Sequence, residues 1–255
     1  MVDEIKSLPA YDWAFAITTA LTQQYIRLED WKFEYGRWAR TIVVNDTEGF
    51  RLSVGGRTTK YFSQFIRLGG YIAYGFKDRT PKWELTTEFN FNRERQRMLT
   101  LDYKKDFTQL GSGTGVFTAQ NLFSSIFARN HGNMQSMVHS FRIAYDHEFS
   151  PNVNSHLAFT RSRIWGNDHV PLRRASDGLL QPSYTTNEVQ AQLRFSWDER
   201  VTRNYFKKRY LFTKYPVVTL NVIGGFPGIS PEDVKYLRTE LIVNWRVPAT
   251  AIGYL

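Results

Sequence analysis

The sequence contains no cysteine, which excludes a disulfide framework, a thiolate metal site and a cysteine nucleophile. It also lacks any apolar run near the roughly 18 residues that a membrane-spanning helix needs. The first thirteen residues, MVDEIKSLPAYDW, do not show the basic, apolar and small-residue regions of a signal peptide in order. If the chain is exported, we expect its signal to lie upstream in a longer parent protein.

The motifs of the commoner catalytic chemistries are missing as well. None of the five histidines stands in an HExxH arrangement, and no serine stands in a GxSxG context. The glycine-rich stretch at 111–115 is not followed by the Lys-Ser or Lys-Thr pair of a phosphate-binding loop. We therefore expect no catalytic residue, no metal site and no cofactor.

Aromatic residues, by contrast, make up 16% of the chain, although its mean hydropathy is only -0.42. A transmembrane β-barrel reconciles the two values, because only every second residue of each strand meets lipid. The formal charge of +9 is scattered along the chain and is not gathered on one helix or patch. This pattern favours an anionic lipopolysaccharide-bearing surface over nucleic acid as the partner.

Alternation of apolar and polar residues with a period of two is the main signal, and it predicts antiparallel strands. It is clearest at Trp83–Phe91, Glu188–Trp197 and Leu237–Val247. Less regular strands are expected at Lys32–Val44, Phe50–Val54, Ile66–Phe76, Leu99–Phe107, His139–Phe149, His156–Ile164 and Val217–Ile223. About ten strands of this length suit a tilted membrane crossing, whereas strands of soluble sandwiches are usually nearer five or six residues.

The expected connections are short at Asn92–Arg97 and Ser150–Asn154 but long at Thr108–Ser136 and Trp165–Thr185. Outer-membrane barrels have short periplasmic turns and long external loops, so the N-terminus is expected to be periplasmic. Tyr11–Thr22 carries apolar residues at helical spacing after a proline. We expect residues 1–30 to form a helical periplasmic or interfacial lead-in, and residues 31–255 the barrel region.

Two sets of side chains are candidates for function. Charged residues on the polar parity of the strands are expected to form a salt-bridged network inside the barrel, rather than catalytic carboxylate pairs, because the charges of a polar lumen must find partners. This set comprises Glu84, Glu88, Arg142, Asp146, Glu148, Arg194, Arg238, Glu240 and Arg246. Aromatic residues near strand ends are expected to form girdles at the membrane interfaces: Trp83, Phe91, Phe107, Phe149, Trp197 and Trp245.

Four segments also resemble a known family. They are Glu48–Thr59, Ile66–Asp78, Leu101–Gly111 and Lys214–Val222, and they resemble the barrel region of a family of Bacteroidota outer-membrane proteins. The resemblance implies a membrane barrel of unassigned function, commonly preceded by a carboxypeptidase-regulatory-like β-sandwich. It also implies a remote similarity to surface-antigen barrels of the BamA and TamA type. Because this chain lacks the sandwich and stops at TAIGYL, we expect it to be a piece of a longer protein.

The sequence thus predicts an all-β protein, an antiparallel transmembrane β-barrel in the outer membrane with a transport, assembly or scaffolding role. Its expected partners are outer-membrane lipid, lipopolysaccharide and unidentified envelope proteins. Two alternatives stay open: an outer-membrane enzyme acting on lipid or peptide at the barrel rim, and a soluble lipocalin-like binder whose apolar parity faces inward. If Trp83, Leu193 and Trp245 point into the interior, the lipocalin-like binder is favoured; if they point outward, the membrane barrel is favoured.

Overall fold

The computed structural model describes residues 25–27, 32–36, 38–92, 94–109, 135–168, 170–174, 177–227 and 235–245. Throughout these ranges the chain is all-β and its strands pair antiparallel, which confirms the predicted fold class at this level. Their only helical element is the single 3-10 turn η1 (Trp38–Arg40). The predicted helix at Tyr11–Thr22 lies outside the described residues.

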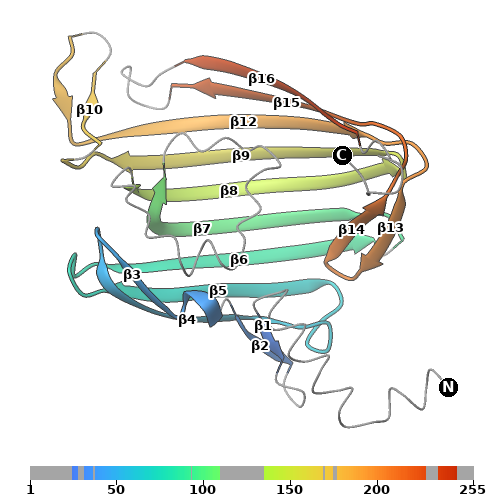
Figure 1. Ribbon diagram of the computed structural model, residues 1–255, viewed down its shortest axis with the longest axis horizontal. Helices are drawn as coiled ribbons and strands as arrows, with labels where there is room; N and C mark the ends of the chain where they lie inside the picture. The colour runs from blue at the N-terminus through green and yellow to red at the C-terminus, as the bar shows by residue number, and fades with distance from the viewer. Residues whose placement is uncertain are drawn as a thin grey trace, which may run out of the picture.

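Twelve strands form one curved sheet in which neighbours in the chain are mostly neighbours in space (Figure 1). Its order is β1 (Tyr25–Arg27), β2 (Phe33–Gly36), β4 (Gly49–Thr58), β5 (Ile66–Gly75), β6 (Pro81–Asn92), β7 (Arg97–Gln109), β8 (Gln135–Ser150), β9 (Val153–Trp165), β12 (Ser183–Phe195), β15 (Val217–Phe226) and β16 (Tyr236–Asn244). Strand β3 (Ile42–Asn45) also pairs with β4. Two separate hairpins interrupt this meander: β10 (Leu172–Arg173) with β11 (Leu180–Gln181), and β13 (Arg200–Asn204) with β14 (Lys207–Phe212).

Most predicted strands are found within a few residues of their expected bounds, but two expectations were wrong. The strand expected at Lys32–Val44 is broken into β2, η1 and β3, because the chain turns at Trp38–Arg40. The helical lead-in expected up to residue 30 contains strand β1, which pairs with β2. The two hairpins were not predicted.

The two ends of the sheet, β1 and β16, do not pair with each other in the described part of the chain. Barrel closure requires hydrogen bonds between the first and last strands. The described residues therefore form an open curved sheet, and no closed barrel is found among them, in line with the expectation that the chain is a piece of a longer protein.

The two faces of this sheet differ in a consistent way. Large apolar side chains of one parity are exposed, and they reach 74% exposure at Leu237. Polar and charged side chains of the other parity are covered, and Lys82 is 0% exposed. Small residues such as Ala73 and Ala144 share the covered face and leave room for the long charged side chains.

Gly70 lies in the middle of β5, close to the backbone of the neighbouring strand β6. A Cβ atom there would lie 2.3 Å from the carbonyl oxygen of Glu84 on β6, closer than packed atoms allow. We predict that Gly70→Ala lowers the free energy of unfolding by about 1–3 kcal/mol, because the β5–β6 backbones must separate. Denaturant unfolding measures this, with Gly224→Ala in β15 as the matched control, since a Cβ there meets nothing within 4 Å. Equal losses in both variants would contradict the prediction.

Candidate functional site: the polar concave face

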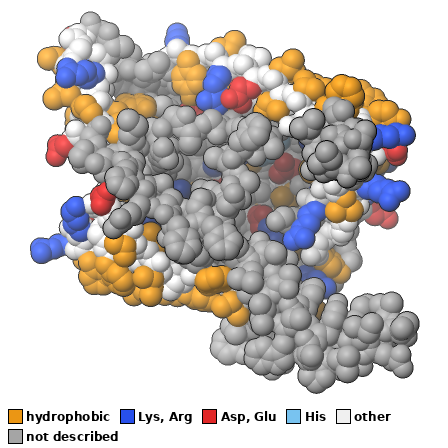
Figure 2. Space-filling view, in the orientation of Figure 1, with side chains coloured by type: hydrophobic (Ala, Val, Ile, Leu, Met, Phe, Trp, Pro, Cys, Tyr) orange, Lys and Arg blue, Asp and Glu red, His pale blue; other side chains and the backbone are white. Residues whose placement is uncertain are grey.

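The covered polar side chains of the sheet line its concave face, and the β13–β14 hairpin folds over one end of that face. Figure 2 shows charged side chains in the hollow and hydrophobic side chains along the upper and lower borders. The concave face is the candidate functional site because it gathers most of the buried charge. Buried charged groups are costly to desolvate and persist where they are paired.

One cluster joins β4 to β7. Arg51 makes two hydrogen bonds of 2.8 Å to the carboxylate of Asp106 and lies 3.1 Å from Glu48. The hydroxyl of Tyr71 also donates to Asp106. Next to it, Lys82 forms ion pairs of 2.7 Å with Glu48 and with Asp78. Each of these buried charges therefore has an opposite charge within hydrogen-bonding distance.

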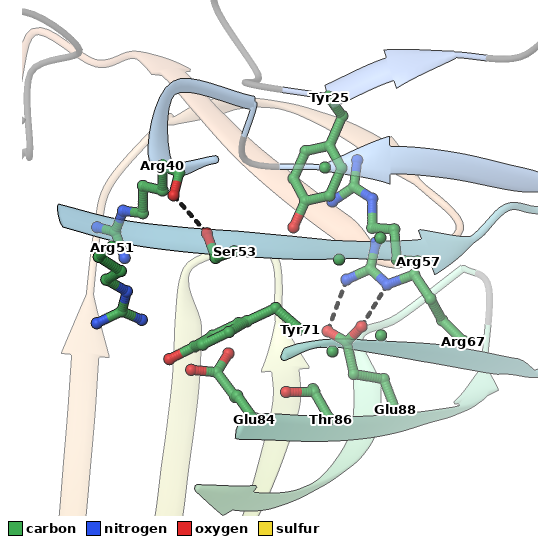
Figure 3. Close-up of a pocket in the computed structure, with 15 residues that line it drawn as sticks. Tyr25, Arg40, Arg51, Ser53, Arg57, Arg67, Tyr71, Glu84, Thr86 and Glu88 are labelled. Carbon is green, nitrogen blue, oxygen red and sulfur yellow. Dashed lines mark hydrogen bonds and ion pairs between the residues drawn. The ribbon is translucent and has the colours of Figure 1, made fainter. Parts of the chain in front are cut away.

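A cavity of about 230 Å³ lies beside this cluster, over the inner faces of β4, β5 and β6 (Figure 3). Glycines at 55 and 69 contribute to its lining and have no side chain to fill it. Two of its arginines are paired with carboxylates: Arg67 donates to Glu88 at 2.6 Å, and Arg57 donates to Glu34 at 2.8 Å. The ring of Tyr25 lies 3.7 Å from the Arg57 guanidinium. This cavity is polar, and Arg51, Arg57 and Arg67 in its lining are already neutralised.

A second group joins β8 to β9. His156 lies between Asp146, whose Oδ1 is 2.8 Å from Nδ1, and Arg142, whose Nη2 is 2.9 Å from Nε2. A guanidinium only donates hydrogen bonds, so Nε2 must carry a lone pair and Nδ1 must carry the proton that Asp146 accepts. Both ring nitrogens are engaged. In this arrangement the imidazole is not free to take a proton from a nucleophile.

The β13–β14 hairpin is held to the concave face by polar contacts with several strands. Glu148 on β8 is 1% exposed and binds Arg203 and Lys208 of the hairpin, with Lys208 at 3.3 Å. Lys208 also donates to the amide oxygen of Asn154 on β9 at 2.9 Å. Phe206, at the hairpin turn, is buried under the Arg67 guanidinium, 4.9 Å from its ring centre. These contacts close one end of the concave face.

Burial and ion pairs shift the pKa values of two charged residues of the hairpin region, Glu199 and Lys208. Burial acts to raise the pKa of Glu199, but two hydrogen bonds from Arg194, of 2.6 and 2.8 Å, outweigh it and hold that pKa below its usual range. Burial lowers the pKa of Lys208, and its ion pair with Glu148 offsets only part of this effect. Glu199 is therefore held in its ionised form.

All eight described members of the predicted polar network have the parity of the concave face: Glu84, Glu88, Arg142, Asp146, Glu148, Arg194, Arg238 and Glu240. Arg246 lies outside the described residues. They do not, however, form one network among themselves. In the described part of the chain, contacts of these residues go to others outside the set, such as Arg67, His156 and Glu199, whereas Arg238 and Glu240 approach each other at 3.9 Å.

The predicted girdle aromatics fall at two levels. Phe91, Phe149, Trp197 and Trp245 are exposed and lie near the strand ends on the side of the β13–β14 hairpin. Trp83 and Phe107 lie toward the opposite strand ends and are half-buried. Lys105 lies 4.9 Å from the ring centre of Trp83.

Several residues of the site were missed by sequence reasoning. The hairpin residues Arg203 and Lys208 lie in a strongly basic stretch without apolar alternation, so nothing marked them as strands. His156 was weighed only as a metal ligand, and its even parity on β9 was the signal that placed it beside Asp146. In the described part of the chain, no group of three His, Cys, Asp or Glu residues could hold a metal ion.

Comparison with known proteins gives one match. Residues 19–255 match the C-terminal domain of a family of unknown function, DUF5686. No curated protein matches the chain.

Proposed function

The chain belongs to the DUF5686 family through its C-terminal domain, and we propose that it is a strand-built outer-membrane domain with a transport, assembly or scaffolding role. In this proposal the apolar convex face meets acyl chains, and the polar concave face lines the interior. It performs no chemistry of its own. Membership of the family supplies no activity, because the family itself has none assigned.

The observation that carries the proposal is the exposure of the apolar parity on successive strands. Ile72 on β5, Leu85 on β6, Leu157 on β9 and Leu241 on β16 are all more than half exposed. Exposed apolar patches larger than a few hundred Å² are rare on soluble monomers. Acyl chains are the solvent that makes such a face stable.

The height of the apolar band supports the same reading. On β12 it runs from Asn187, which pairs with the outward Arg161 on β9, to Trp197 just beyond the strand end. These ten steps span roughly 34 Å along the strand, or roughly 25 Å along the membrane normal at the usual tilt. Arg161 and Arg163 lie at or beyond the edge of this band, where arginine is tolerated.

The two alternatives fare differently against the geometry. A lipocalin-like binder needs apolar side chains turned inward, whereas Leu193 and Trp245 are exposed at 39% and 60%. A rim enzyme needs a free base beside a nucleophile, whereas both nitrogens of His156 are occupied. Neither alternative is supported by a specific observation in the described residues.

Lipid contact can be tested with the seven tryptophans of the chain. The chain is refolded into phosphatidylcholine vesicles with ordinary or brominated acyl chains, and tryptophan fluorescence is compared. We expect the protein to float with the vesicles and its emission to be quenched by bromine, because Trp197 is exposed and continues the outward parity of β12 at the band edge. A chain that stays in the aqueous phase, with equal emission in both preparations, would refute the membrane proposal.

A further inference from the structure

A second cavity, of about 440 Å³, lies where β8, β9 and β12 meet the β13–β14 hairpin. It is nearly twice the volume of the cavity between β4 and β6 and falls in the usual range of ligand sites. A neighbouring cavity of about 510 Å³ shares Gln190, Gln192, Arg194 and Tyr210 with it. The two cavities form a polar trough along the concave face.

The lining of the 440 Å³ cavity carries an excess of positive charge. Arg142, Arg194 and Lys208 line it, whereas Asp146 is the single carboxylate in the lining. Side-chain amides of Gln190, Gln192 and Asn154 supply neutral hydrogen-bonding groups between them. Such a set of fixed donors is suited to an anion rather than to a cation.

Arg142 differs from the other two cations. Arg194 is bound by both oxygens of Glu199, and Lys208 is bound by Glu148. Arg142 has no carboxylate within ion-pair distance among the described residues, although Asp102 is its register partner on β7, and its hydrogen bond there goes to His156. Arg142 has no side-chain nitrogen among the buried unpartnered polar atoms of the described residues, and it lines the cavity. The protein thus holds a guanidinium in place and leaves most of its donors to a ligand.

Asp146 and His156 set the position of that guanidinium. Asp146 fixes the tautomer of His156, and His156 in turn holds one nitrogen of Arg142, as the donor rules of the three groups require. A carboxylate placed directly on Arg142 would have neutralised it, as Glu88 does for Arg67. An interposed imidazole orients the arginine without a direct ion pair to it.

We propose that this cavity binds an oxyanion, a phosphate or carboxylate group, through Arg142. The inference rests on the proposed function, because a ligand reaches the concave face through the interior of the domain. The same oxyanion chemistry is offered by a free anionic solute and by a phospholipid headgroup. The convex face is the one turned toward lipid, so the free solute is the expected source.

The test uses the full chain in micelles of a nonionic detergent and isothermal titration with inorganic phosphate. Arg142→Gln is expected to weaken phosphate binding about tenfold or more, the loss of one charge-assisted, two-pronged contact. Arg142→Lys, which keeps the charge, is expected to lose less. Arg161→Gln is the matched control: it removes the same charge from the convex side of the adjacent strand, opposite Phe141, and should stay within about twofold of the wild type.

A second titration uses micelles doped with phosphatidylglycerol in place of inorganic phosphate. If the doped lipid binds in an Arg142-dependent way and free phosphate does not bind, the ligand is a lipid headgroup. The oxyanion site at Arg142 is then still supported. No binding of either probe, or equal losses in Arg142→Gln and Arg161→Gln, overturns the proposal. Because micelles cover the convex face, this result is independent of whether the chain floats with vesicles.

Discussion

Replacing Glu148 by glutamine is expected to release the β13–β14 hairpin from the concave face. The carboxylate of Glu148 receives Arg203, Lys208 and the backbone N–H of Gln96, and it is almost fully buried. Removing one partner of a buried ion pair costs about 3–5 kcal/mol, because the remaining charge stays desolvated. Arg203 is about one-third exposed and can regain water, whereas the Lys208 side chain is 3% exposed and cannot.

The lower end of that range, about 3 kcal/mol, corresponds to a roughly hundredfold shift in the equilibrium for local opening. Hydrogen–deuterium exchange in micelles measures it, and faster exchange is expected at residues 200–212 while β6 to β9 keep theirs. Asp102→Asn is the control, because Asp102 accepts a hydrogen bond from Thr86 on the same face. Unchanged exchange of the hairpin in Glu148→Gln would show that Glu148 does not anchor it.

A charge placed on the convex face is expected to block membrane insertion. Leu193 lies near the middle of the apolar band on β12, between Asn187 and Trp197, and its side chain points outward. Arginine at the lipid-facing midplane costs about 2–4 kcal/mol. We predict that Leu193→Arg lowers the folded fraction in phosphatidylcholine vesicles by at least one order of magnitude at the midpoint denaturant concentration.

The adjacent residue provides the matched comparison. Gln192 lines the trough of the concave face, so Gln192→Arg adds the same charge to a polar surface and should cost about 1 kcal/mol or less. In water the order would reverse, because an exposed leucine tolerates arginine and a covered glutamine does not. The folded fraction of both variants is measured by protease protection in vesicles across a series of urea concentrations. A larger loss for Gln192→Arg would contradict a lipid-facing Leu193.

Period-two alternation was a sufficient guide to the long strands. Leu193 and Gln192 show why: consecutive side chains of a strand point to opposite faces, so a run of alternating residues fixes both the strand and its two surfaces. Breaks in the pattern were harder to place. Trp38–Arg40 turns within a stretch whose composition suits a strand, and only pairing of β3 with β4 shows where the chain reverses.

The β13–β14 hairpin could not be predicted for a different reason. Its residues lack apolar alternation because one side meets buried carboxylates and the other meets water. Its fold depends on a partner, Glu148, that lies 55 residues earlier in the chain. The aromatic residues near strand ends were easier to find, since their place in the strand follows from the alternation itself.

The amino-acid sequence by itself determined that the chain folds into antiparallel strands with one apolar and one polar face, because those properties follow from neighbouring residues and the geometry of a strand. Only the tertiary structure decided which charges meet. Arg51 reaches Asp106, and His156 stands between Asp146 and Arg142, because strand register brings together atoms that the sequence keeps apart. Register depends on the summed pairing of whole strands. No local sequence pattern therefore encodes which arginine is left without an ion-pair partner.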